Sequence, residues 1–113
     1  MLPISNSKDR GDRKIGYIRE VAAEFVSRNS NRTSLITVTR TEMSIDGKGA
    51  KIFISVLPEN KEEEALDFLK RQRSEFRKYL GEKIRMYPLP YIDFLIDIGE
   101  KNRQRLEEMS KPT

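Results

Sequence analysis

Residues 35–57 read LITVTRTEMSIDGKGAKIFISVL, a pattern that predicts a β-hairpin. Leu35 to Ile45 is rich in β-branched residues and alternates imperfectly between apolar and polar positions, which is typical of a strand with one wet face. Asp46 to Gly49 has the composition of a tight turn. Ala50 to Leu57 places an aliphatic residue or alanine at every second position, so we expect it to return antiparallel beside the first strand.

Two segments around the hairpin show the spacing of amphipathic helices. Arg13 to Asn29 repeats apolar residues three and four positions apart, at Ile15, Ile18, Val21, Ala22, Phe25 and Val26. Lys61 to Arg85 has a similar stripe, made of Ala65, Leu66, Leu69, Phe76, Leu80 and Ile84. Glutamates at positions 62–64 stand where the positive end of a helix dipole favours anions. We therefore expect one helix before the hairpin and a longer helical segment after it.

The apolar stripe of the second helical segment lapses at Gln72, Arg73 and Ser74. A serine side chain competes for backbone hydrogen bonds inside a helix, but it can cap the start of a new one. We therefore predict a kink at these three residues, with Ser74 opening a second helix.

A third strand is predicted from Tyr91 to Ile98, where aliphatic or aromatic residues occupy every second position. Pro88 and Pro90 exclude a helix immediately before it. The charged tail that follows carries Leu106 and Met109 three positions apart, which indicates only a short, marginal helix.

The chain of 113 residues has room for one core, so we expect a single domain at residues 13–98. Residues 1–12 lack a periodic apolar face that would offset the entropy of ordering them, and we interpret them as a flexible leader. Residues 99–113 form the charged C-terminal tail. The order helix, strand, strand, helix, helix, strand is that of a type II KH domain. This is an α+β fold in which a three-stranded sheet carries helices on one face, here with a helix-kink-helix segment.

The composition argues against an enzyme and favours an acidic partner. The chain has no Cys and no His, so thiolate ligands and the commonest general base are missing. We expect no catalytic residues, no metal site and no cofactor. Lys and Arg number 22 against 18 Asp and Glu, which favours nucleic acid as the partner. No apolar run reaches the roughly 18 residues of a membrane span, and residues 1–13 are too polar for a secretory signal, so we expect a cytoplasmic protein.

Positive charge is concentrated between residues 70 and 85. The basic residues there are Lys70, Arg71, Arg73, Arg77, Lys78, Lys83 and Arg85. Only Glu75 and Glu82 oppose them, so this segment carries more positive charge than the net +4 of the whole chain. Such a cluster can neutralise phosphates by counterion release, and its arginines can stack on bases. The alternative is a solvated helix face without a ligand.

Further candidates for contact with RNA lie around this cluster. Lys48 and Lys51 flank the hairpin turn, and Arg28 and Arg32 end the first helix, although each pair can equally be plain surface charge. Three tyrosines can either stack on unpaired bases or pack at the rim of the core: Tyr79, Tyr87 and Tyr91.

Two groups of carboxylates could be considered as metal ligands, but ordinary surface charge explains them more simply. Glu62, Glu63 and Glu64 with Asp67 are explained by the charge preference of a helix start, and a second set of ligands is missing. Asp93 and Asp97 alternate along one face of the third strand, and an exposed sheet face accounts for them equally well.

With these elements in order, the chain resembles the ribosome-binding factor A (RbfA) family across residues 13–109. Residues 35–46 are similar to the first strand and turn of that family, and residues 50–57 are close to its second strand. A third segment joins the strand Ile92 to Asp97 to residues that occur in the family's order and nearly at its spacing: Phe76, Arg77, Leu80, Gly81, Lys83, Ile84, Arg85 and Pro90.

The resemblance implies a KH-like, RNA-binding protein that acts on the free small ribosomal subunit. It also implies a role in late maturation and 5′-end processing of small-subunit rRNA, often most important in the cold. The family replaces the KH Gly-x-x-Gly loop with an Ala-x-Gly kink, whereas Gln72, Arg73 and Ser74 stand here. Because a backbone without glycine cannot approach RNA as closely, we expect side chains around the kink to make the contacts. Glu100 also departs from the family, which usually has an apolar residue at that position.

Two other classes of function remain open at this point. A monomer of this fold could grip a protein partner through its sheet face or charged tail, instead of RNA. An enzyme built on carboxylates is a third hypothesis, which the absence of His and Cys weakens. Co-migration with free small subunits is expected only of the ribosome assembly factor.

Overall fold

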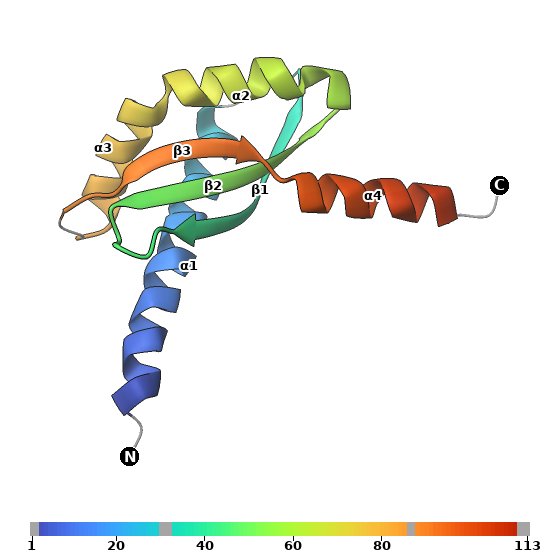
Figure 1. Ribbon diagram of the computed structural model, residues 1–113. Coiled ribbons are helices and arrows are strands. Elements are labelled where there is room, and N and C mark those ends of the chain that lie inside the picture. Colours follow the sequence, from blue (N-terminus) through green and yellow to red (C-terminus); the bar gives the residue numbers. More distant parts are fainter. Residues whose placement is uncertain (1–2, 30–32, 86–87, 111–113) are drawn as a thin grey trace.

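The structure, a computed structural model, describes residues 3–29, 33–85 and 88–110, with the side chains of residues 3–12 outside that description. Helices and strands follow in the predicted order, with one short 3-10 helix added and a longer C-terminal helix than predicted (Figure 1). They are α1 (Pro3–Asn29), β1 (Leu35–Met43), β2 (Gly49–Leu57), η1 (Glu59–Lys61), α2 (Glu62–Arg71), α3 (Arg73–Lys83), β3 (Tyr91–Ile96) and α4 (Ile98–Ser110).

The strands form one mixed sheet in the order β1-β2-β3. β1 and β2 pair antiparallel as the predicted hairpin, and β2 and β3 pair parallel after the crossover through α2 and α3. Gly47 in the hairpin turn has a φ of 73°, a left-handed conformation that glycine adopts without steric cost. The pairing register shifts between Val38 and Arg40, so a bulge at Thr39 changes which residues of β1 face the core.

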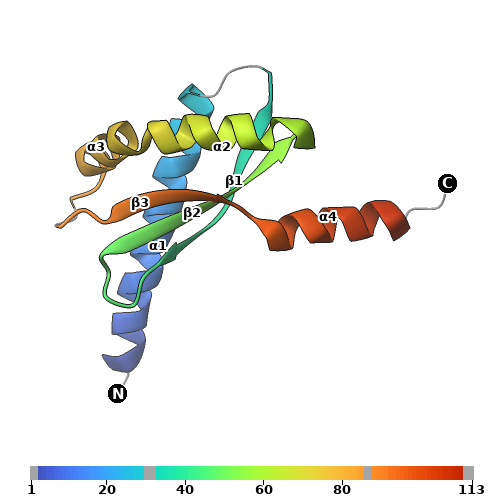
Figure 2. The same ribbon diagram turned by 45° about the horizontal axis from the view of Figure 1, so that its top comes forward.

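The core lies between one face of the sheet and the helices α1, α2 and α3. Ile52 and Ile54 of β2 are fully buried, and so are Phe76 of α3 and Phe94 of β3. Phe76 contacts Phe25 of α1 and Phe94 in edge-to-face geometry, with ring centroids 5.2 and 5.8 Å apart. In Figure 1 the strands pass in front of α1, and Figure 2 shows α2 and α3 alongside the same sheet. The opposite face of the sheet is open.

Helix α1 starts at Pro3, ten residues before the predicted start at Arg13. Extending an existing helix fixes one residue for each hydrogen bond gained, so helical backbone can continue beyond the apolar stripe that packs on the sheet. The packed part is the predicted one, because Ile18, Val21, Ala22, Phe25 and Val26 are buried. That residues 1–12 form a flexible leader without a role in the core remains a prediction.

The predicted kink is present, but the cap is a different residue. α2 ends at Arg71, and Gln72 is both the C-cap of α2 and the N-cap of α3, so Ser74 lies inside α3 and does not cap it. The Gln72 N–H donates to the carbonyls of Phe68 and Leu69 at 3.2 and 3.0 Å, and its own carbonyl accepts from Phe76 N–H at 2.8 Å. Backbone hydrogen bonds therefore bridge the kink without a capping side chain.

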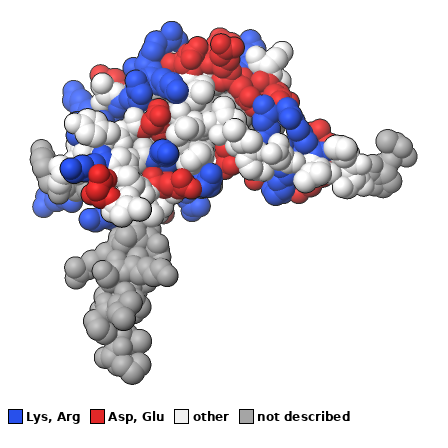
Figure 3. Space-filling view, viewed as in Figure 1, with Lys and Arg blue, Asp and Glu red and all other residues white. Residues whose placement is uncertain are grey.

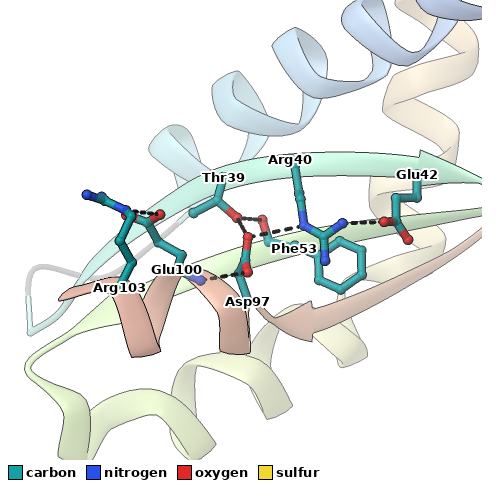
Figure 4. Close-up of polar contacts among 7 residues, drawn as sticks. All are labelled: Thr39, Arg40, Glu42, Phe53, Asp97, Glu100 and Arg103. Carbon is teal, nitrogen blue, oxygen red and sulfur yellow. Dashed lines mark hydrogen bonds and ion pairs between the residues drawn. The ribbon is translucent and has the colours of Figure 1, made fainter. Parts of the chain in front are cut away.

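Strand β3 ends at Ile96, two residues before the predicted end, because Asp97 caps helix α4, which begins at Ile98. The Asp97 carboxylate accepts a hydrogen bond from Glu100 N–H at 3.0 Å, which is the geometry of an N-cap. It also accepts from the Thr39 hydroxyl at 2.6 Å and the Arg40 Nε at 3.3 Å, as Figure 4 shows. The prediction that Asp97 lies on an exposed sheet face was wrong, because the residue is only 5% exposed.

Helix α4 is attached to the domain by polar contacts. None of its described residues is buried, and Ile98, Leu106 and Met109 are exposed. Lys101 forms ion pairs with Glu59 at 2.8 Å and Glu62 at 3.0 Å. These two carboxylates raise the pKa of Lys101. The tail is thus a continuous helix, longer than the short one predicted. Among the described residues, no helix combines the length and apolar composition that crossing a membrane requires.

Candidate nucleic-acid interface

The predicted basic cluster is gathered around the kink. Lys70 and Arg71 lie in the last turn of α2, and Arg73 opens α3. Along α3 and just beyond it, the exposed members are Lys78, Lys83 and Arg85. Lys70 and Arg77 are half-buried. The structure therefore brings these residues to one end of the molecule and leaves most of their charge in solvent.

The charge along α2 is polarised. Its first turn contains Glu62, Glu63 and Glu64, while Lys70 and Arg71 lie in its last turn. Figure 3 shows acidic residues along the length of α2 and basic residues where α2 meets α3. Because the acidic end repels phosphates and the basic end attracts them, a bound nucleic acid is expected at the kink and not along the whole helix.

Arg73 projects from the kink over the open side of the sheet. Its Nε donates to the Lys70 carbonyl at 3.0 Å, and its Nη1 lies 3.5 Å from an Asp93 carboxylate oxygen on β3. Both side chains of the ion pair are about half exposed, at 50% and 44%, so the pair holds Arg73 only weakly. The guanidinium is therefore positioned beside β3 and still accessible to a phosphate or a base.

Arg77 has a structural role that the charge pattern did not predict. Its Nη2 donates to the Leu89 carbonyl at 2.9 Å, and its Nε donates to the Pro90 carbonyl at 3.1 Å. The guanidinium also lies 5.4 Å from the centroid of the Tyr91 ring. Arg77 thus fixes the segment that enters β3. Two of its N–H groups are used in these backbone hydrogen bonds and are not available to RNA.

The two lysines of the hairpin are exposed at the same end of the sheet as the start of β3. Lys51 pairs with Asp93 across β2 and β3, and the Lys48 carbonyl accepts a hydrogen bond from Tyr91 N–H at 2.8 Å. Arg73 reaches Asp93 from the kink. Lys48 and Lys51 are therefore close to Arg73 at the kink, although they precede it in the chain by 25 and 22 positions.

The candidate tyrosines differ in their surroundings. Tyr79 packs against Phe25 with ring centroids 5.7 Å apart, and burial together with the nearby Glu24 raises the pKa of its hydroxyl. Tyr91 is 74% exposed on the open face. Tyr87 and Arg32 lie outside the described residues, and Arg28 forms an ion pair with Glu24 at 3.0 Å. Of the described tyrosines discussed, Tyr91 is the one available for stacking.

The carboxylates do not form a recognisable metal centre. In the part of the chain that the structure describes, no three His, Cys, Asp or Glu side chains are arranged to hold an ion. Glu62 contacts Lys101, and Glu64 lies 3.4 Å from Lys61, so both have cationic partners. Burial raises the pKa of Asp97, but hydrogen bonds from Thr39 and Glu100 N–H and the charge of Arg40 bring it below its ordinary value.

Comparison with known proteins identifies the relatives of this chain. The family model described as ribosome-binding factor A matches residues 10–110. A ribosome-binding factor A from Bdellovibrio bacteriovorus is 30% identical over 110 residues, covering 90% of this chain and 82% of that protein. One from Fervidobacterium nodosum is 34% identical over 77 residues, covering 67% of this chain but only 62% of its relative.

Solved structures show the same KH-like fold. The crystal structure of ribosome-binding factor A from Thermus thermophilus superposes with a TM-score of 0.69 at 25% identity, over 76% of this chain and 94% of that one. A Thermus thermophilus RbfA homology model, fitted into the cryo-EM map of a 30S–RbfA complex, gives a TM-score of 0.64 at 27% identity. That match covers 72% of this chain and 88% of the other. The predicted α+β, type II KH-like fold is thereby confirmed.

Proposed function

The chain belongs to the ribosome-binding factor A family, and we propose that it is a cytoplasmic assembly factor for the small ribosomal subunit. In this proposal it binds the free subunit as a monomer, assists late maturation and 5′-end processing of small-subunit rRNA, and catalyses no reaction itself. The need for it is expected to be greatest in the cold. The family match over residues 10–110 and the Thermus thermophilus relative fitted into a 30S complex support this proposal.

The observation that carries the proposal is the concentration of exposed positive charge at the kink. Arg71 and Arg73 flank Gln72, and both are exposed. Phosphate neutralisation by such residues releases condensed counterions, so binding should weaken steeply as salt rises. No backbone glycine is present at the kink, so these side chains, and not the main chain, supply the contacts with RNA.

Sedimentation of a cell extract on a sucrose gradient tests the proposal. The protein should co-migrate with free small subunits and not with assembled ribosomes, and raising the salt should move it to the top of the gradient. Extracts from cells that lack the protein should contain small-subunit rRNA with unprocessed 5′ ends. Co-migration with a protein complex that contains no ribosomal RNA would favour the protein-interaction hypothesis, for which the exposed apolar residues of α4 would be the contact surface.

A further inference from the structure

A hollow of about 280 Å³ lies at the hairpin end of the sheet. It lies where β1 ends and where β2 and β3 begin, and its lining includes Glu42, Gly49, Lys51, Tyr91 and Asp93. Glu42, Lys51 and Asp93 share one rung across β1, β2 and β3, and they alternate with core residues along the strands, so their side chains lie on the open face. This volume is below that of most sites for drug-sized ligands, and it suits a small planar group.

Tyr91 gives this hollow an aromatic wall that is already held in place. The Arg77 guanidinium lies 5.4 Å from the ring centroid and is itself hydrogen-bonded to the carbonyls of Leu89 and Pro90. The Tyr91 backbone N–H is bonded to Lys48 at 2.8 Å. With 74% of the residue exposed, most of the ring remains free for a partner. An exposed aromatic residue on an open sheet face is a platform on which an unpaired base can stack.

The polar groups around the hollow suit a nucleotide. Gly49 of β2 pairs with Tyr91 of β3, and Lys51 is the next residue along β2 on the same face. The Lys51 ammonium can therefore reach the phosphate of a nucleotide whose base stacks on the Tyr91 ring. The Asp93 carboxylate lies 3.5 Å from the Arg73 Nη1, so the hollow adjoins the basic residues at the kink. The carboxylate of Glu42 pairs with Arg40, and that of Asp93 pairs with Arg73 and accepts from Phe94 N–H. Because carboxylates only accept hydrogen bonds, their remaining lone pairs favour a base that carries an amino group.

We propose that this hollow binds one unpaired base of single-stranded RNA, stacked on Tyr91, with Lys51 at its phosphate. The bound base carries an exocyclic amino group, because uracil would turn its O4 carbonyl, in place of the amino donor of cytosine, toward the carboxylates of Glu42 and Asp93. This inference rests on the proposed function and extends it, since the kink supplies affinity for the RNA backbone and the hollow supplies selectivity for a base.

Binding of two labelled heptaribonucleotides, UUUCUUU and UUUUUUU, to the full chain tests the inference. Cytosine and uracil have rings of the same size but differ at position 4 and at N3, so the comparison keeps the stacking area constant and changes the hydrogen-bonding edge of the base. The wild type should bind UUUCUUU more tightly by about tenfold or more, as expected for one hydrogen bond to a carboxylate. Tyr91→Leu should weaken binding of UUUCUUU about tenfold through lost stacking, whereas Tyr91→Phe should stay within about twofold of the wild type.

Control variants separate the hollow from the kink. Arg71→Glu leaves the lining of the hollow unchanged, so it should weaken both oligonucleotides equally and preserve the preference for cytosine. Tyr91→Leu should instead abolish that preference, and its melting temperature will show that the domain is folded. Equal affinity of the wild type and Tyr91→Leu for UUUCUUU would overturn the hollow as a base site. If the wild type still co-sediments with small subunits when the base site has been refuted in this way, the proposed function stands without that site.

Discussion

Replacing Asp97 with alanine is expected to destabilise the domain by about 2 to 4 kcal/mol. Asp97 connects three elements, because it accepts hydrogen bonds from Thr39 in the β1 bulge, from Arg40, and from the Glu100 N–H at the start of α4 (Figure 4). Its side chain is 7% exposed, so water cannot readily replace these partners.

The magnitude follows from the contacts one by one. Loss of an N-cap acceptor typically costs about 1 kcal/mol. The 2.6 Å hydrogen bond from the Thr39 hydroxyl to a charged acceptor adds about 1.5 to 3 kcal/mol. Arg40 is 49% exposed, so its ion pair with Asp97 contributes little more. Without Asp97, the single hydroxyl proton of Thr39 can turn to the Phe53 carbonyl, 3.2 Å away, which keeps the total toward the lower half of the range.

Urea denaturation followed by circular dichroism measures this loss directly. Asp97→Asn keeps the shape and the cap but removes the charge, so about half of the destabilisation is expected. Asp67→Ala on the exposed side of α2 is the matched control and should change stability by less than about 0.5 kcal/mol. If Asp97→Ala were no more destabilising than Asp67→Ala, the inferred role of Asp97 in joining the bulge to α4 would be wrong.

Three further predictions concern other parts of the molecule. The folded pKa of Asp97 lies below its ordinary value of 3.8, so its contribution to stability is present above about pH 4 and is lost as the pH falls through the folded pKa. Acid denaturation curves should show this loss of stability for the wild type and not for Asp97→Asn. Phe76→Ala should lower the unfolding free energy by about 3 to 5 kcal/mol, because it opens a cavity between Phe25 and Phe94. In the same urea titration, Leu106→Ala on exposed α4 should lower it by less than about 0.5 kcal/mol. Arg77→Lys should lower the unfolding free energy by about 1 to 3 kcal/mol, because one ammonium cannot reproduce the two guanidinium hydrogen bonds to the carbonyls of Leu89 and Pro90. Similar melting temperatures for the variant and the wild type would contradict this.

The parts of the fold that local pattern determines were predictable from the sequence. Alternation along residues 50–57 and the spacing from Ile18 to Val26 each indicated the element and its buried face. The lapse at Gln72 likewise indicated the kink. The ends were less predictable, because Ile98 continues the alternation of β3 although it is already the first residue of helix α4. A period of two cannot reveal a helix cap at the last position of the pattern.

The individual roles of polar residues were not predictable, because their partners are distant in sequence. Thr39 meets Asp97 from 58 positions away, and only after a bulge has turned it toward the end of β3. Arg77 looks like any other member of the basic cluster, and only the packing of α3 against the segment before β3 brings it to two carbonyls. The position of Lys51 beside Tyr91 likewise depends on the parallel pairing of β2 and β3.

Co-sedimentation of a charge-reversed kink variant with purified small subunits tests the central claim most directly. Arg71→Glu combined with Arg73→Glu reverses two exposed charges at the kink, and Lys14→Glu combined with Arg19→Glu makes the same change in charge on exposed positions of α1. The kink variant should lose binding at physiological salt while remaining folded, and the α1 variant should bind nearly as well as the wild type. Equal binding by the two variants would show that the kink is not the surface that contacts the ribosome.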